Sequence, residues 1–125
     1  MTRTVIAVAL AAMLGACASM YGTPMQAKVD NGALVNAAGM TLYTFDKDAA
    51  GDGKSACNGP CATNWPPLHA GANDQILGTW SVITRNDGSK QLAYKGKPLY
   101  LWVKDHKPGD RIGDGFLKVW HVATP

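Results

Sequence analysis

Short apolar runs alternate with stretches of glycine, aspartate, asparagine and proline along most of this chain. Helix formers are scarce, since the sequence has no glutamate, while 14 glycines and 7 prolines supply turns. This pattern favours short strands, and Pro60 is placed to start one helical turn at residues 61–64. We therefore predict a mainly β fold, a single small domain of short antiparallel strands. The expected strands are residues 33–36, 41–45, 80–85, 91–94, 99–103 and 116–122, the first two as a hairpin and the next three as a meander.

One pattern occurs twice, at an offset of 57 residues. A glycine, Gly39 or Gly96, stands three residues before a Leu-Tyr pair. An aromatic residue follows the tyrosine two positions later, and an aspartate follows it five positions later. These positions are Tyr43, Phe45 and Asp48 in the first copy and Tyr100, Trp102 and Asp105 in the second. Two copies are too few for a solenoid, so we predict one domain built from two pseudo-repeats, at about residues 33–67 and 90–125.

The first residues form an export signal. Arg3 precedes an apolar run at residues 5–14 that is well under the roughly 20 residues of a membrane-spanning helix. The run ends in Leu14-Gly15-Ala16-Cys17, which resembles the lipobox of bacterial lipoproteins. We expect a signal peptide at 1–16, lipidated Cys17, a tether at 17–28 and the β-rich domain at 29–125. Ala18 rather than aspartate after the cysteine favours an outer-membrane lipoprotein facing the periplasm; the alternative is a soluble secreted protein cut after Ala18.

Cys57 and Cys61 are the other two cysteines of the chain. In an exported protein such a pair is most often a disulfide, and this one would close a short loop worth on the order of 2 kcal/mol. A Cys-x-x-x-Cys pair could instead exchange disulfides or bind Cu(I), with His69 as a third ligand. Both interpretations remain open at the level of sequence.

Catalytic signatures are lacking. The sequence has no Ser-His-Asp elbow, phosphate loop or paired carboxylate motif. His69, His106 and His121 share no metal-ligand spacing, and the aspartates of residues 46–56 fit a calcium loop poorly. We predict no cofactor and no metal, and the lack of these signatures favours a protein that is not an enzyme without deciding the question. Without Arg3, 11 basic and 9 acidic residues remain and form no basic block, so nucleic acid is not an expected partner.

Large aromatic residues are the remaining candidates for function. The residues are Tyr43, Phe45, Trp65, Trp80, Tyr94, Tyr100, Trp102 and Trp120. Residues two apart on a strand point to the same face, so these rings are expected to fill the core between the two copies. Any that stay exposed would form a patch suited to a glycan or an envelope protein.

The repeated motif resembles that of the Yx(F/W/Y)xxD lipoproteins, a bacterial family described as a secreted repeat of unknown function. The segments Cys57 to Pro67, Arg85 to Tyr100 and Trp120 to Pro125 add to the resemblance. It implies an exported, usually lipid-anchored β-rich domain, held to the membrane by its lipid, and it implies no catalytic residues. We expect a binding or scaffold domain of the cell envelope; the alternative is a thiol redox or Cu(I)-binding protein using Cys57 and Cys61.

Overall fold

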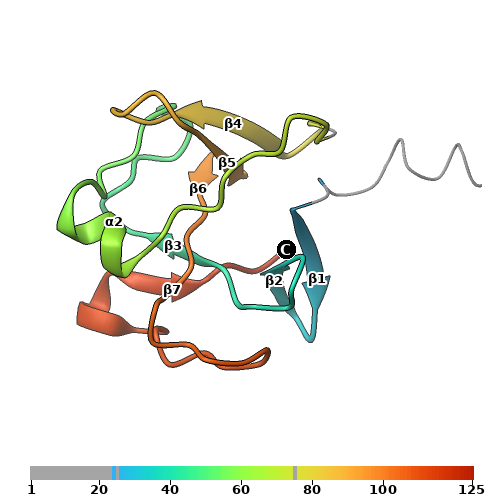
Figure 1. Cartoon of the computed structure of the whole chain (residues 1–125), viewed down its shortest axis with the longest axis vertical. Coiled ribbons are helices and arrows are strands. Elements are labelled where there is room, and N and C mark those ends of the chain that lie inside the picture. Colours follow the sequence, from blue (N-terminus) through green and yellow to red (C-terminus); the bar gives the residue numbers. More distant parts are fainter. Residues whose placement is uncertain (1–23, 25, 75) are drawn as a thin grey trace, which may run out of the picture.

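The computed structural model describes residues 24, 26–74 and 76–125. The expected signal peptide and the lipidation site Cys17 lie outside these residues. Within them the chain forms three small antiparallel sheets, one short α-helix and one 3-10 turn (Figure 1). The elements are β1 (Ala27–Asp30), β2 (Ala33–Asn36), β3 (Tyr43–Phe45), α2 (Pro60–Asn64), β4 (Trp80–Thr84), β5 (Lys90–Tyr94), β6 (Lys97–Pro98), η2 (Phe116–Lys118) and β7 (Trp120–Val122). The predicted mainly β fold with one helical turn is confirmed.

The first sheet is a hairpin of β1 and β2 around Asn31 and Gly32, both of which have positive φ. The sequence indicated this turn but not the strand before it. Strand β1 includes Ala27 and Lys28, which were expected at the end of the tether. The expected hairpin of 33–36 with 41–45 is reduced to a single bridge between Val35 and Thr41. Strand β3 instead pairs with β7 from the far end of the chain.

The centre of the molecule is a backbone pair between the two tyrosines of the repeated motif. Tyr43 N donates to Tyr100 O at 2.8 Å, and Tyr100 N donates to Tyr43 O at 2.9 Å. This antiparallel exchange relates the two repeats by an approximate two-fold axis, because each tyrosine occupies the equivalent position of its own repeat. The predicted pseudo-symmetry therefore passes through the motif itself.

The Leu-Tyr pairs direct alternate side chains into two separate cores, as successive residues of extended backbone must. Leu42 and Leu99 lie in an aliphatic cluster with Leu34, Leu68 and Leu92. Tyr43 and Tyr100 lie in an aromatic cluster, whose other members are Phe45, Cys57, Trp65, Trp102 and Trp120. The expectation that the motif aromatics fill the core is thus met.

Two strand predictions near the C-terminus were wrong. Residues 99–103 form no continuous strand, because consecutive backbone groups bond to different segments: Leu99 N to Leu92 O, Tyr100 N to Tyr43 O and Leu101 N to Pro66 O. Residues 116–119 are not extended either, since Leu117 and Lys118 have left-handed backbones and make the 3-10 turn η2. Only residues 120–122 of the last expected strand pair, as β7. Of the predicted meander, the antiparallel pairing of β4 with β5 is confirmed, but the third strand is β6, two residues that lie just before the expected residues 99–103.

The glycine of each motif permits a close approach by the loop of the other repeat. A Cβ added to Gly96 would lie 2.6 Å from Gly51 N, and one added to Gly39 would lie 3.2 Å from Pro108 Cβ. Gly51 N donates to Gly96 O at 2.9 Å, which ties the β5–β6 turn to the 46–56 loop. The spacing seen in the sequence therefore reflects contact between repeats as well as a turn.

Replacing Gly96 by alanine is expected to destabilise the domain more than the same change at Gly32. Both glycines have φ +80°, so both variants carry the left-handed strain of roughly 1 kcal/mol, but only Gly96 has backbone within 4 Å of the new methyl group. The extra crowding should cost about 1–3 kcal/mol more. Urea unfolding of the two variants measures the difference; equal losses would contradict the close-approach role.

Candidate functional site

The motif aromatics form a continuous stack of four rings. Phe45 stacks on Trp120 at a centroid distance of 4.2 Å, Trp120 on Trp65 at 3.8 Å, and Trp65 on Trp102 at 4.0 Å. The order respects the two-fold relation, since Phe45 and Trp102 are equivalent, as are Trp65 and Trp120. All four are buried. The stack is therefore structural core, and these rings are not available to a glycan or a protein.

Each motif tyrosine donates its hydroxyl proton to the aspartate of the other repeat. Tyr43 Oη lies 2.7 Å from Asp105 Oδ2, and Tyr100 Oη lies 2.6 Å from Asp48 Oδ2. The second oxygen of each carboxyl accepts a backbone N–H from its own loop, from Ala56 at Asp48 and from Ile112 at Asp105. The tyrosine and the aspartate of one motif therefore do not bond to each other. Each bonds to its counterpart in the other motif.

Buried Arg85 distinguishes the Tyr100–Asp48 pair from the Tyr43–Asp105 pair. Its guanidinium donates to Ser55 Oγ at 3.0 Å, to Gln91 Oε1 at 2.8 Å and to Cys57 O at 2.6 Å. Ser55 Oγ lies 2.7 Å from Tyr100 Oη, and it is the donor there because the tyrosine proton goes to Asp48. Among the described residues no carboxylate lies within ion-pair distance of Arg85. Its charge is balanced through this chain of hydrogen bonds, which links β4 to the disulfide loop.

Burial sets the ionisation of these groups. Desolvation raises the pKa of Asp48 and of Asp105, while the tyrosine hydrogen bond at each partly offsets it. Desolvation also raises the pKa of both tyrosines, which stay protonated donors. Because the two carboxyls bind protons more readily folded than unfolded, the stability they contribute is full below about pH 3.8 and is lost as pH rises through their raised pKa. Asp87 and Asp110 have the opposite effect on stability, since hydrogen bonds lower the pKa of each.

The two cysteines of the folded part are joined. Cys57 and Cys61 form a disulfide, with 2.07 Å between the sulfurs, at the start of α2. Cys57 is fully buried and packs in the aromatic core. His69 is not brought to the pair: the described residues contain no group of three or more histidine, cysteine or acidic side chains that could hold a metal. The predicted disulfide is therefore present, with Cys57 in the core, and His69 does not join it.

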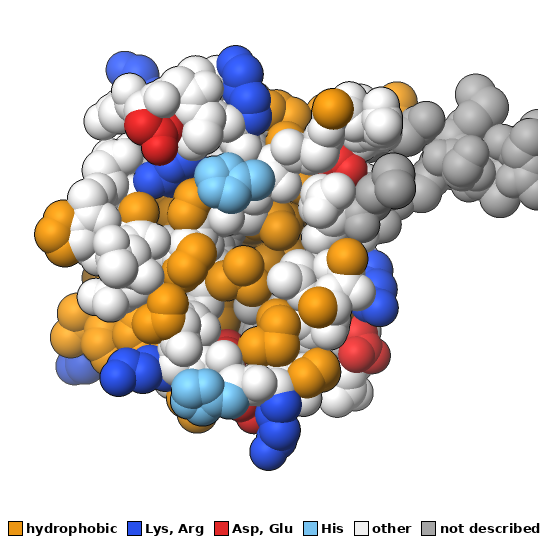
Figure 2. Space-filling model, viewed as in Figure 1, with side chains coloured by type: hydrophobic (Ala, Val, Ile, Leu, Met, Phe, Trp, Pro, Cys, Tyr) orange, Lys and Arg blue, Asp and Glu red, His pale blue; other side chains and the backbone are white. Residues whose placement is uncertain are grey.

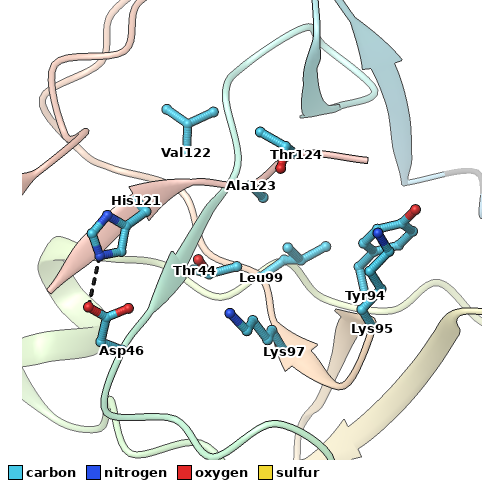
Figure 3. A pocket seen from close by; sticks show the side chains of 10 residues that line it. All are labelled: Thr44, Asp46, Tyr94, Lys95, Lys97, Leu99, His121, Val122, Ala123 and Thr124. Atoms are coloured by element: carbon cyan, nitrogen blue, oxygen red, sulfur yellow. Dashed lines mark hydrogen bonds and ion pairs between the residues drawn. The ribbon is translucent and has the colours of Figure 1, made fainter.

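A cleft of about 290 Å³ lies between the β3–β7 pair and the β5–β6 turn (Figure 3). The residues around it are Thr44, Asp46, Tyr94, Lys95, Lys97, Leu99, His121, Val122, Ala123 and Thr124. Tyr94 and Lys95 stand at one end and the His121–Asp46 pair at the other, with Lys97 between them. The left-handed Lys95 and Gly96 form the tight turn that carries both lysines.

Positive charge dominates this cleft. His121 Nε2 lies 2.8 Å from Asp46 Oδ2, so the one carboxylate present already has a partner. Both members of that pair are about half exposed, at 45% and 49%, where solvent screens an ion pair strongly. Within the described part of the chain no carboxylate lies within ion-pair distance of Lys95 or Lys97. The cleft is therefore suited to an anionic group.

Sequence reasoning missed this cleft, because its residues were unremarkable one by one. His121 faces Asp46 only because β7 pairs with β3, and no local pattern of residues links those two strands. The signal that could have found it is the Lys95-Gly96-Lys97 turn, which places two cations around a tight hairpin. His69 and His106 are exposed elsewhere, and among the predicted aromatics only Tyr94 remains partly exposed.

We expect each tyrosine-to-phenylalanine change to act on the carboxyl of the other repeat. Since the lost hydroxyl lowers the pKa of its partner, Tyr100→Phe should raise the pKa of Asp48 further and leave Asp105 unchanged. Tyr43→Phe should do the reverse. Each variant also leaves a buried acceptor unpaired and should lose about 1–3 kcal/mol of stability. Carboxyl ¹³C NMR titration is the measurement, and each variant is the control for the other; a shift confined to the aspartate of the mutated repeat would exclude crossed pairing.

Comparison with known proteins agrees with this duplicated architecture. A family described as a secreted repeat of unknown function matches the chain twice, at residues 26–69 and 81–124. No curated protein and no solved structure gave a match. No helix among the described residues has the length and apolar character needed to cross a bilayer. The two matches cover most of the chain, and the protein belongs to this family of secreted repeats of unknown function.

Proposed function

We propose that this protein is a lipid-anchored domain of the cell envelope that binds an acidic ligand, without transforming it, in the cleft beside the Lys95-Gly96-Lys97 turn. The observation that carries the proposal is a concave site with two lysines, neither of which has a carboxylate partner among the residues that the structure describes. Export is supported by membership of a secreted family. The anchor rests on Leu14 to Cys17, which resembles a lipobox.

The lining of the cleft favours binding over catalysis. Neither serine nor cysteine lines it, and its histidine is an exposed partner of Asp46 rather than of a nucleophile. The hydroxyls of Thr44 and Thr124 and the ring of Tyr94 offer polar and stacking contacts beside the two ammonium groups. Such a set suits a carboxylated sugar, whose ring can lie on an aromatic side chain while its carboxylate meets a cation.

The size of the cleft limits what it holds. At about 290 Å³ it is at the lower end of ligand sites, which span roughly 300–1,000 Å³. A site of this size would take one or two units of a longer glycan rather than enclose a large molecule. An acidic envelope glycan therefore fits better than a bulky cofactor.

Loss of the Lys97 charge should weaken this binding. We expect an oligogalacturonate of three units to bind the native protein. Lys97→Met should raise the dissociation constant about threefold to tenfold, as expected for the loss of one ionic contact. Lys90→Met is the matched control, because Lys90 is exposed but lies outside the cleft. Maltotriose controls for the neutral sugar. Titration calorimetry measures all of them; equal affinity in the two lysine variants, or none for the acidic sugar, would reject the cleft.

The anchor is tested separately. Acyl chains contribute about 0.8 kcal/mol per buried methylene, so Cys17→Ser should move the exported protein from the membrane fraction to the soluble fraction. Ala18→Asp keeps the cysteine and should leave the protein attached, but in the inner rather than the outer membrane. Fractionation and density-gradient separation of the membranes measure both. Retention of Cys17→Ser in the membrane fraction would show that the attachment does not use this cysteine.

A further inference from the structure

Four apolar side chains are exposed on the two segments of the second repeat that flank the end of the ring stack, at residues 103 and 112–117; we name them the apolar tip: Val103, Ile112, Phe116 and Leu117. Phe116 lies against Trp102 and Trp65, with ring centroids 4.9 and 5.8 Å apart. Val103 follows Trp102 in the chain, and Phe116 N bonds to Gly113 O, next to Ile112. Ile112 is 61% and Leu117 74% exposed, so most of this apolar surface meets solvent.

The tip is held outward by its own loop. Asp105 accepts the N–H of Ile112, and Asp110 Oδ2 accepts those of His106 and Lys107. Leu117 has φ +53°, a conformation rare for a bulky residue that directs it away from the core. Burial within the domain therefore does not account for this leucine. An apolar side chain fixed in a strained, exposed position points to something outside the molecule.

Charge and area identify the kind of surface. Exposed Lys104 and Lys118 directly adjoin Val103 and Leu117, and Figure 2 shows hydrophobic side chains beside Lys or Arg at the lower left, where Figure 1 places η2. Taking roughly 150–200 Å² for a fully exposed large side chain, the four expose about 300–400 Å². A stable protein interface takes about 800 Å² from each partner, of which roughly 450 Å² is apolar, so the tip falls short of one. Binding to a lipid surface has no such minimum area. Its free energy becomes more favourable with each apolar side chain that is inserted and with each neighbouring cation that meets an anionic headgroup.

We propose that the apolar tip inserts into an anionic bilayer surface. Val103, Ile112, Phe116 and Leu117 enter the boundary between headgroups and acyl chains, and Lys104 and Lys118 contact the headgroup phosphates. The contact is distinct from the cleft and from the anchor at Cys17. In an anchored protein it supplies the second of the two signals that stable membrane attachment requires, and it fixes which face of the domain meets the lipid.

The test uses the whole exported chain carrying Cys17→Ser, so that no lipid is attached. Vesicles of phosphatidylcholine with about 30% phosphatidylglycerol are expected to bind it more strongly than phosphatidylcholine alone. Adding Ile112→Ser and Leu117→Asn should weaken partitioning about tenfold or more. Asparagine is chosen because it tolerates the left-handed backbone of residue 117, which keeps the fold intact. Val29→Ser is the control, since Val29 is 51% exposed on β1, away from the tip.

Cosedimentation gives the partition coefficients, and sedimentation velocity gives the oligomeric state. The proposal is supported if the tip variant loses vesicle binding and the Val29 variant keeps it. It is overturned if the parent chain binds neither kind of vesicle, or if the tip variant binds as strongly as the parent chain. A concentration-dependent dimer that disappears in the tip variant would also overturn it, by assigning the surface to a second copy of the chain.

Discussion

The reciprocal hydrogen bonds between Tyr43 and Tyr100 are the constraint on which the rest of the structure depends. The backbone exchange fixes the two repeats antiparallel at one point, and the two hydroxyls then reach the carboxyls of the opposite loops. Those carboxyls in turn hold the loops by their backbone N–H groups. Loops rich in glycine and aspartate, with little apolar surface of their own, are ordered in this way by polar contacts to the centre.

The aromatic stack follows from the same geometry. Once Tyr43 and Tyr100 are paired, the residues two positions later lie on the same side, and each meets the tryptophan of the other repeat: Phe45 meets Trp120, and Trp102 meets Trp65. The tryptophans then stack on each other across the axis. Both proposed binding sites lie where the symmetry fails, since the cleft lies beside the β5–β6 turn and the apolar tip on the loop of the second repeat.

Local signals in the sequence were sufficient for much of this fold. Alternation and turn residues located β2, β4, β5 and the turn at Pro60, and the duplication indicated a pseudo-symmetric domain. Strand pairing between residues far apart in the sequence could not be predicted, because nothing in the residues around Tyr43 shows that it pairs with Val122. The bridging role of residues 99–101 was missed for the same reason, as was the His121–Asp46 pair. The motif aromatics were correctly predicted to fill the core, while the burial of Asp48 and Asp105 and the cleft depend on contacts that only the assembled chain creates.

The crossed tyrosine–aspartate pairs have a consequence for how such a molecule can arise. One repeat by itself presents a tyrosine hydroxyl and a carboxyl that are complementary to each other but placed so that they cannot meet within that repeat. The surface is self-complementary about a two-fold axis, which is the condition for an isologous homodimer. Joining two copies in one chain replaces the second subunit with a tandem partner always present at high effective concentration. It also frees the two halves to diverge, so that one gains a disulfide and the other an apolar tip that a symmetric dimer would have been obliged to display twice.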